Sequence, residues 1–107
     1  MDRVKLEPIE KDKFRVYQDY YYQGICVPKG FVTNGADIPR ILWSFFPPNS
    51  PEYLSAVVIH DYMCAKIGVF TYKEADAMFY RAMMDIGVSK WKAKLFYFCV
   101  RLYHKFR

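Results

Sequence analysis

Residues 51–80, PEYLSAVVIHDYMCAKIGVFTYKEADAMFY, contain two predicted helices joined by a short turn, and the rest of the chain is organised around them. The first helix is apolar on nearly every side, which is typical of a helix buried in a core. His60 and Asp61 nevertheless lie in its middle, and a buried charge is costly unless it is paired or bound to an ion. The second helix opens with Thr71-x-x-Glu74, the pattern of a capping box. The stretch thus predicts a helical pair with ionisable groups in its interior.

His60 and Asp76 are expected to meet between these two helices. If Gly68 ends the first helix in a left-handed cap, His60 lies roughly 10 Å back from the turn at about 1.5 Å per residue. Asp76 lies roughly 7 Å beyond the turn on the same scale, and antiparallel helices pack about 8–10 Å apart. The two side chains should therefore be within hydrogen-bond reach, directly or through one water. Asp61 points about 100° away around its helix and is left for a different partner.

Composition places the chain among globular domains. With 107 residues it is long enough for one hydrophobic core and too short for two, so we expect a single domain. Hydrophobic residues make up 53% of the sequence and aromatic residues 20%, which excludes a disordered chain. No apolar run reaches the length of a membrane span, and the opening residues, MDRVKLEPIEKDK, lack the apolar core of a signal peptide. The net charge of +5 indicates tolerance of anionic surfaces and no more.

Three cysteines, Cys26, Cys64 and Cys99, lie far apart within apolar segments. An odd number at such spacings is typical of reduced, buried thiols in a protein made in the cytosol. His60 and Cys64, at positions i and i+4 of one helix, form half of a zinc site. The other candidate ligands, His104, Cys26 and Cys99, have no matching spacing, so we expect no zinc. We also expect no nucleotide, because the chain has no glycine-rich phosphate loop.

The N-terminal third, about residues 1–36, is expected to form a small antiparallel β-meander. Apolar and charged residues alternate there, and tyrosines favour extended backbone. Gly24 permits a turn or bulge before the strand at residues 25–27. The turn Pro28-Lys29-Gly30 then predicts that residues 31–33 pair back onto residues 25–27.

The loop Thr33-Asn34-Gly35-Ala36-Asp37 leads from the meander to a short helix near residues 38–46. Asn34-Gly35 strongly favours positive φ, which would turn backbone carbonyls or amides towards a ligand. Asp37 suits the N-cap of the short helix. The alternative interpretation is a loop that serves only to turn the chain.

The last helix is expected to begin after Gly87, with Ser89 as its N-cap, and to run to the C-terminus. Apolar residues at helical spacing predict the face that packs on the core, and these are Trp91, Leu95, Phe98, Cys99, Leu102 and Phe106. Lysines and arginines cover much of the remainder; a solvated face explains them best and a membrane-surface patch second. They form no specific nucleic-acid motif. The chain as a whole is predicted to be α+β, with the β-meander followed, from about residue 37 to residue 107, by a short helix and a three-helix bundle.

Four short motifs resemble a family of small phage and prophage proteins of unknown function. The family pattern is G-F-x-T-[DN]-G-A-[SD]-I-P, an aromatic- and proline-rich segment, H-D-Y, and E-A-D-x-x-F. In this chain these occupy Gly30–Pro39, Trp43–Pro48, His60–Tyr62 and Glu74–Phe79, and the likeness spans about residues 25–103. The family usually has T-D-G-A-S, so Asn34 and Asp37 exchange the position of the carboxylate here. The resemblance implies a phage-encoded protein, made in the bacterial host cytoplasm and acting there or in the virion.

A second resemblance, to the paired helices of phospholipases A2, lies in an A-x-x-x-H-D helix followed by an A-D-x-x-F helix. In those enzymes a histidine takes a proton from water, a distant aspartate orients it, and the adjacent aspartate binds calcium. By position, the resemblance implies that His60 is the base, Asp76 its orienter and Asp61 the calcium ligand. Asn34 and Gly35 would belong to the calcium loop, although the Y-x-G-x-G pattern of that loop is absent here. The disulfides of the secreted members are also absent, as they are in the viral members.

Two classes of function stay open on this reasoning. In the first, the chain is a calcium-dependent lipid ester hydrolase that acts at a phospholipid surface. Calcium needs hard oxygen ligands, which Asp61 and loop carbonyls can supply, and it would polarise the ester carbonyl. In the second, the chain is a virion or tail assembly module or a binder of a host protein, and the His–Asp pair only knits two helices together. A cavity reaching His60 from solvent would favour the enzyme, and a sealed His60 would favour the module.

Overall fold

The computed structural model of the chain describes residues 3–10, 13–33, 53–66 and 68–105. Strands come first and helices second, which confirms the predicted α+β class. The elements are β1 (Leu6–Glu10), β2 (Lys13–Val16), β3 (Tyr20–Tyr22), β4 (Ile25–Val27), β5 (Val32–Thr33), α2 (Leu54–Ala65), α3 (Tyr72–Asp85) and α4 (Lys90–Lys105). The predicted short helix near residues 38–46 lies outside the described residues.

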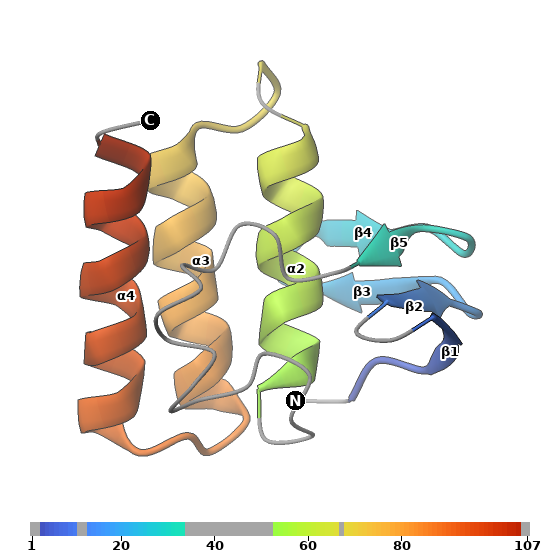
Figure 1. Ribbon diagram of the computed structural model, residues 1–107, viewed down its shortest axis with the longest axis horizontal. Coiled ribbons are helices and arrows are strands. Elements are labelled where there is room, and N and C mark those ends of the chain that lie inside the picture. The colour runs from blue at the N-terminus through green and yellow to red at the C-terminus, as the bar shows by residue number, and fades with distance from the viewer. Residues whose placement is uncertain (1–2, 11–12, 34–52, 67, 106–107) are drawn as a thin grey trace.

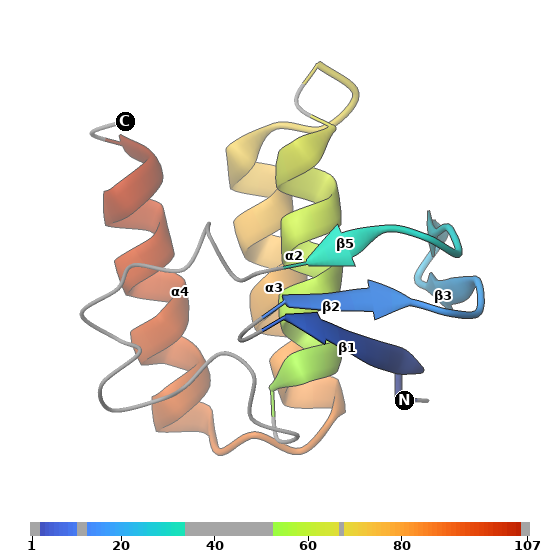
Figure 2. The same ribbon diagram turned by 45° about the vertical axis from the view of Figure 1, so that its right-hand side comes forward.

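The helices stand side by side, with α3 between α2 and α4, and the strands lie on the other side of α2 (Figures 1 and 2). Helix α2 therefore has packing partners on both sides, which explains why it is apolar almost all round. Among the described residues, no helix combines the length and the apolar character needed to cross a membrane.

The strands form two antiparallel sheets, one of order β1-β2-β5 and one made by the hairpin β3-β4. At the hairpin turn, Gln23 and Gly24 have φ of 49° and 81°, the positive values that a tight two-residue turn requires. The predicted pairing of residues 31–33 with residues 25–27 is wrong. The main chain of Phe31 bonds to Val16 instead, with 2.9 Å between Val16 N and Phe31 O, and so continues the sheet from β2. Local turn chemistry could not choose between two available strand edges.

Helix α3 begins as its sequence predicts. The Glu74 backbone N–H donates to Thr71 Oγ1 at 3.1 Å, and the Thr71 N–H donates to Glu74 Oε1 at 2.9 Å. This capping box satisfies two amides that the first turn cannot bond internally. The preceding helix ends at Ala65, and Gly68, with φ of 110°, turns the connection. The box therefore fixes where α3 starts, and with it the height of every side chain along the helix.

Helix α4 packs on the core with only part of the predicted face. Leu95 and Cys99 are half-buried against the core, whereas Trp91, Phe98 and Leu102 are 61%, 62% and 41% exposed. The buried residues of this helix are Ala93, Phe96, Val100 and His104. Apolar residues on two sides satisfy the same helical period, so periodicity could not select the inner face. Small Ala93 and flat Phe96 fit the close contact with α3 better than Trp91 would. Phe106 lies outside the described residues.

Candidate functional site

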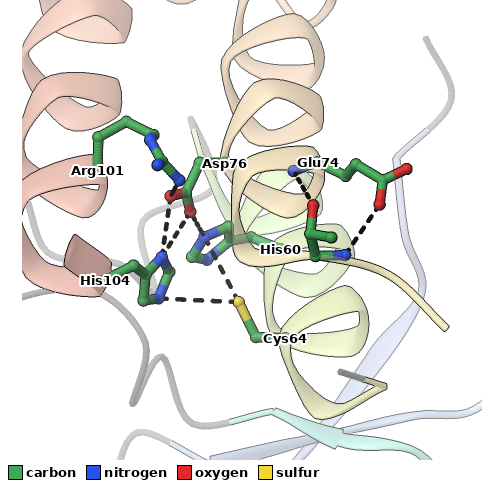
Figure 3. A network of polar contacts seen from close by, with 7 residues as sticks. His60, Cys64, Glu74, Asp76, Arg101 and His104 are labelled. Carbon is green, nitrogen blue, oxygen red and sulfur yellow. Dashed lines mark hydrogen bonds and ion pairs between the residues drawn. The ribbon is translucent and has the colours of Figure 1, made fainter. Parts of the chain in front are cut away.

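Asp76 lies at the centre of a buried polar cluster between the three helices (Figure 3). His60 Nε2 is 2.7 Å from Asp76 Oδ1, so the contact expected between these two residues is confirmed. Two further groups from α4 reach the other oxygen, because His104 Nδ1 and Arg101 Nη1 each lie 2.9 Å from Asp76 Oδ2. Together with Cys64 these residues form what we call the Asp76 cluster.

Each member of the Asp76 cluster is positioned by a different feature of the helices. His60 comes from the middle of α2, and Asp76 from the second turn of α3, just after the capping box. Arg101 and His104 are three residues apart on α4 and therefore lie on the same face of that helix. Asp76 and His60 are fully buried, whereas the Arg101 side chain is 33% exposed. The cluster therefore reaches from the core towards the surface along Arg101.

The carboxyl group of Asp76 is held ionised. Burial on its own would raise its pKa, but hydrogen bonds from His104 and His60, with the positive charge that these rings carry when protonated, lower the pKa to about 2. Arg101 adds a permanent positive charge 2.9 Å from Oδ2. A buried carboxylate of this kind is stable only because its oxygens are bonded to cationic or polar donors.

The ionised state of Asp76 also determines which ring nitrogen of His60 and of His104 carries the hydrogen that is donated to it. A carboxylate only accepts hydrogen bonds, so His60 donates through Nε2–H and His104 donates through Nδ1–H. In a neutral His60 the proton acceptor is then Nδ1, which has no hydrogen-bond partner among the residues that the structure describes. The chemistry available at the cluster is therefore proton acceptance at His60 Nδ1.

Cys64 lies one turn after His60 on α2 and faces both histidines (Figure 3). Its Sγ is 3.7 Å from His60 Nε2 and 4.0 Å from His104 Nε2. One ligand atom from each of these three side chains lies within 4.8 Å of the others. The exclusion of zinc rested on spacing along the chain, and packing of α4 against α3 removes that reason by placing His104 beside Cys64.

His104 and Arg101 were not singled out as site residues by the sequence. The signal that could have found His104 is its position four residues after buried Val100, on the inner face of α4. That face was assigned to the wrong residues, so His104 was not recognised as an interior residue. Once His104 is placed in the interior, Arg101 can also be assigned to the site. A buried carboxylate shared by two histidines is a favourable partner for an arginine one turn away.

Asp61 points to the sheet side of α2, away from Asp76, as its position one residue after His60 predicts. It is 6% exposed, and Thr33 Oγ1 on β5 donates a hydrogen bond to its Oδ2. Thr33 is the first residue of the loop Thr33–Asp37, in which the sequence places the calcium ligands. The other loop residues, Asn34 to Asp37, with the two proposed calcium ligands Asn34 and Gly35, lie outside the described residues.

Three surface hollows lined by described residues lie beside Tyr20, Tyr80 and Phe70. None of these three includes a member of the Asp76 cluster. The walls around the imidazoles are aromatic instead. The ring of Phe79 lies 4.8 Å from that of His60, and Tyr72 stacks on His104 at 4.3 Å between ring centres.

Comparison with known proteins shows which family the chain belongs to. Residues 11–100 match the family described as "Protein of unknown function (DUF1353)". The chain belongs to this family. The expectation of a family of unknown function is confirmed, and the DUF1353 match covers every residue of the Asp76 cluster except Arg101 and His104.

Two curated relatives come from the bacterium Sinorhizobium fredii (strain NBRC 101917 / NGR234), and both carry the description "Uncharacterized protein". The protein y4jT is 41% identical over 78 residues, which are 72% of this chain and 23% of that protein. The protein y4iH is 42% identical over 85 residues, which are 78% of this chain and 35% of that protein. This DUF1353 chain thus spans about a third or less of the length of either relative. No solved structure matches it.

Proposed function

We propose that this chain is a small hydrolase in which His60 is the general base and Asp76 holds it in place. The observation that carries the proposal is the 2.7 Å contact between His60 Nε2 and Asp76 Oδ1, with Nδ1 left as the proton acceptor. A general base needs one nitrogen fixed by a partner and the other within reach of a water molecule. His60 is fully buried, so the proposal requires the core to open beside Nδ1 when substrate binds. The contact between His60 and Asp76 supports this proposal.

Asp76 supports the base in two ways. Its charge stabilises the imidazolium that forms when His60 takes a proton, and its position fixes the ring and the tautomer. Arg101 and His104 hold Oδ2, so the carboxylate cannot rotate away from His60 without breaking two other contacts. His104 and Arg101 therefore act as positioning residues, through Asp76.

Lipid esters are the substrate class that we propose, on the likeness to phospholipases A2, with Asp61 as a calcium ligand. The outer face of α4 supports a lipid surface as the place of action. Exposed Trp91, Phe98 and Leu102 lie along it, and every charged residue of α4 is a lysine or an arginine, apart from titratable His104. Basic helices with such an apolar side bind anionic lipid surfaces.

Full burial favours a second candidate, a binding module in which the Asp76 cluster is structural. His60 and Asp76 are both 0% exposed, and a hydrogen-bonded polar network inside a core can specify how helices pack. In this proposal the same outer face of α4 contacts a protein, in virion or tail assembly or on a host protein. A phage origin, which the motif pattern implies, belongs to this proposal.

The deciding experiment measures release of fatty acid from anionic phospholipid vesicles with and without calcium. The wild-type chain should hydrolyse the ester, and His60→Gln should reduce the rate by roughly two to four powers of ten. Glutamine keeps most of the packing, so circular dichroism should be unchanged. Asp61→Asn should lose calcium binding in calorimetry while the fold is kept, because the amide keeps the shape and loses the charge.

Absence of hydrolysis by the wild type, together with identical calorimetric traces for wild type and Asp61→Asn, would refute the enzyme. Variants of His60, Asp61 and Asp76 that differ only in melting temperature would then support the binding module. Cys99→Ser is the matched control, because Cys99 is a half-buried residue of α4 that does not belong to the Asp76 cluster.

A further inference from the structure

The thiol of Cys64 lies in an unusual position for a buried cysteine. Most buried cysteines pack among apolar side chains and behave as small hydrophobic groups. Here the sulfur faces the Nε2 atoms of two histidines, at 3.7 Å for His60 and 4.0 Å for His104. One sulfur and two imidazole nitrogens are the donor types that zinc takes in proteins.

We propose that Cys64, His104 and His60 bind a divalent transition-metal ion of the zinc type. Zn–S bonds of about 2.3 Å and Zn–N bonds of about 2.0–2.1 Å, at the tetrahedral angle, place a sulfur and a nitrogen about 3.6 Å apart. The two observed sulfur–nitrogen distances are 3.7 and 4.0 Å. Small side-chain shifts therefore bring these three donors to bonding distance from a common centre, with the fourth position left for water.

His104 already has the orientation of a supported metal ligand. Asp76 accepts a hydrogen bond from its Nδ1, which leaves Nε2 directed at Cys64. A carboxylate on the far nitrogen fixes the tautomer and increases the basicity of the nitrogen that binds the metal. Tyr72 stacks on the ring at 4.3 Å and restricts its rotation.

His60 has to exchange one partner for another when the ion binds. Its Nε2 lies 2.7 Å from Asp76 Oδ1 and must turn from this oxygen to the metal. Asp76 keeps hydrogen bonds from His104 and Arg101, so its charge is not left without donors. Metal binding and the His60–Asp76 pair are thus mutually exclusive. On the proposed hydrolase function, and only on it, zinc would inhibit the enzyme.

The charges of the surrounding side chains and the exposure of the site to solvent are compatible with binding of the ion. Binding breaks the S–H bond of Cys64, forms a metal–sulfur bond and releases one proton to solvent, since the thiolate is the ligand. Asp76 and Arg101 balance each other, so the thiolate offsets half of the charge of the ion. Cys64 is 7% exposed, whereas the His104 side chain is 1% exposed and His60 is fully buried, so an ion would approach from the Cys64 side.

The test is titration of the full-length chain with Co²⁺, a spectroscopic substitute for Zn²⁺, followed by displacement with Zn²⁺. The chain should bind one equivalent, with a thiolate-to-cobalt charge-transfer band and the intense visible bands of tetrahedral cobalt. Calorimetry with Zn²⁺ in buffers of different ionisation enthalpy should report release of one proton. Neither readout requires a substrate or an active enzyme, so failure of the hydrolase leaves this test unaffected.

Cys64→Ser should remove the charge-transfer band, and His104→Gln should weaken binding by at least about a hundredfold, which exceeds the usual effect of losing a ligand's supporting partner. Cys99→Ser and Cys26→Ser are the matched controls and should titrate as the wild type does. Serine is nearly isosteric with cysteine, so Cys64→Ser should keep the fold even if His104→Gln does not. The proposal is overturned if the wild type binds no cobalt, or if the band survives in Cys64→Ser.

Discussion

Acid should destabilise this protein through Asp76, in a pH range and by an amount that the structure sets. The folded-state pKa of this carboxyl is about 2, against an ordinary value of 3.8. At about 1.4 kcal/mol per pKa unit, the difference corresponds to about 2 kcal/mol of unfolding free energy. Because the unfolded chain takes up the proton more readily, this contribution is fully present above about pH 4 and is lost as the pH falls towards 2.

Urea unfolding of the wild type and of Asp76→Asn, at a series of pH values from about 6 to 2, measures this contribution. Every other titrating carboxyl is common to both chains, so the difference between their unfolding free energies isolates Asp76 together with the two histidines bonded to it. The wild type should be the more stable chain at pH 6, and its advantage should shrink by about 2 kcal/mol on the way to pH 2. A difference that does not change with pH would show that Asp76 is not held ionised by the histidines, and the assignment of tautomers would then fail with it.

Four further substitutions test the fold. Thr71→Ala removes the capping box and should lower the unfolding free energy by about 0.5–2 kcal/mol in urea titration; no loss would mean that the box does not hold the start of α3. Tyr22→Phe removes the hydroxyl that donates to Asp85 Oδ2 at 2.5 Å and should cost about 1 kcal/mol or somewhat more. Burial and this bond raise the pKa of Tyr22, so an ultraviolet titration should lose one late-ionising tyrosine in the variant. Phe96→Ala should lower the unfolding free energy by about 3–5 kcal/mol, whereas Phe98→Ala on the outer face of α4 should change it by less than about 0.5 kcal/mol; the reverse order would restore the face predicted from periodicity.

The two proposals for the cluster differ in what they ask of His60. The hydrolase needs His60 Nε2 to be hydrogen-bonded to Asp76, whereas the metal site needs Nε2 to bind the ion. Nitrogen chemical shifts of the His60 ring, measured with and without Zn²⁺, report directly which partner it has. This measurement therefore separates a metal ligand from a histidine bonded to Asp76, which is the state that both the catalytic and the structural proposals require.

Short-range chemistry controls several parts of this structure, and these parts could be predicted from the sequence. Thr71 and Glu74 set the start of α3 because they lie within one turn of each other and bond only locally. Gly24 marked the hairpin turn for the same kind of reason, a backbone φ of 81° that other residues avoid. The His60–Asp76 contact also followed, because a short turn between two helices leaves few ways to pair their side chains, and counting residues on each side gives the matching heights.

Tertiary structure alone decided what comes to Asp76 from α4. His104 lies 28 residues from Asp76 in the chain, and no local pattern fixes the rotation of α4 about its axis. Apolar residues occur on two sides of that helix, so the choice of inner face depends on which side chains fit against α3. Once Ala93 and Phe96 fill that contact, His104 and Arg101 turn inward to the carboxylate, and Trp91 and Phe98 stay exposed. Packing between distant segments therefore made a four-residue polar network, with a cysteine beside it, from what the sequence showed only as a pair.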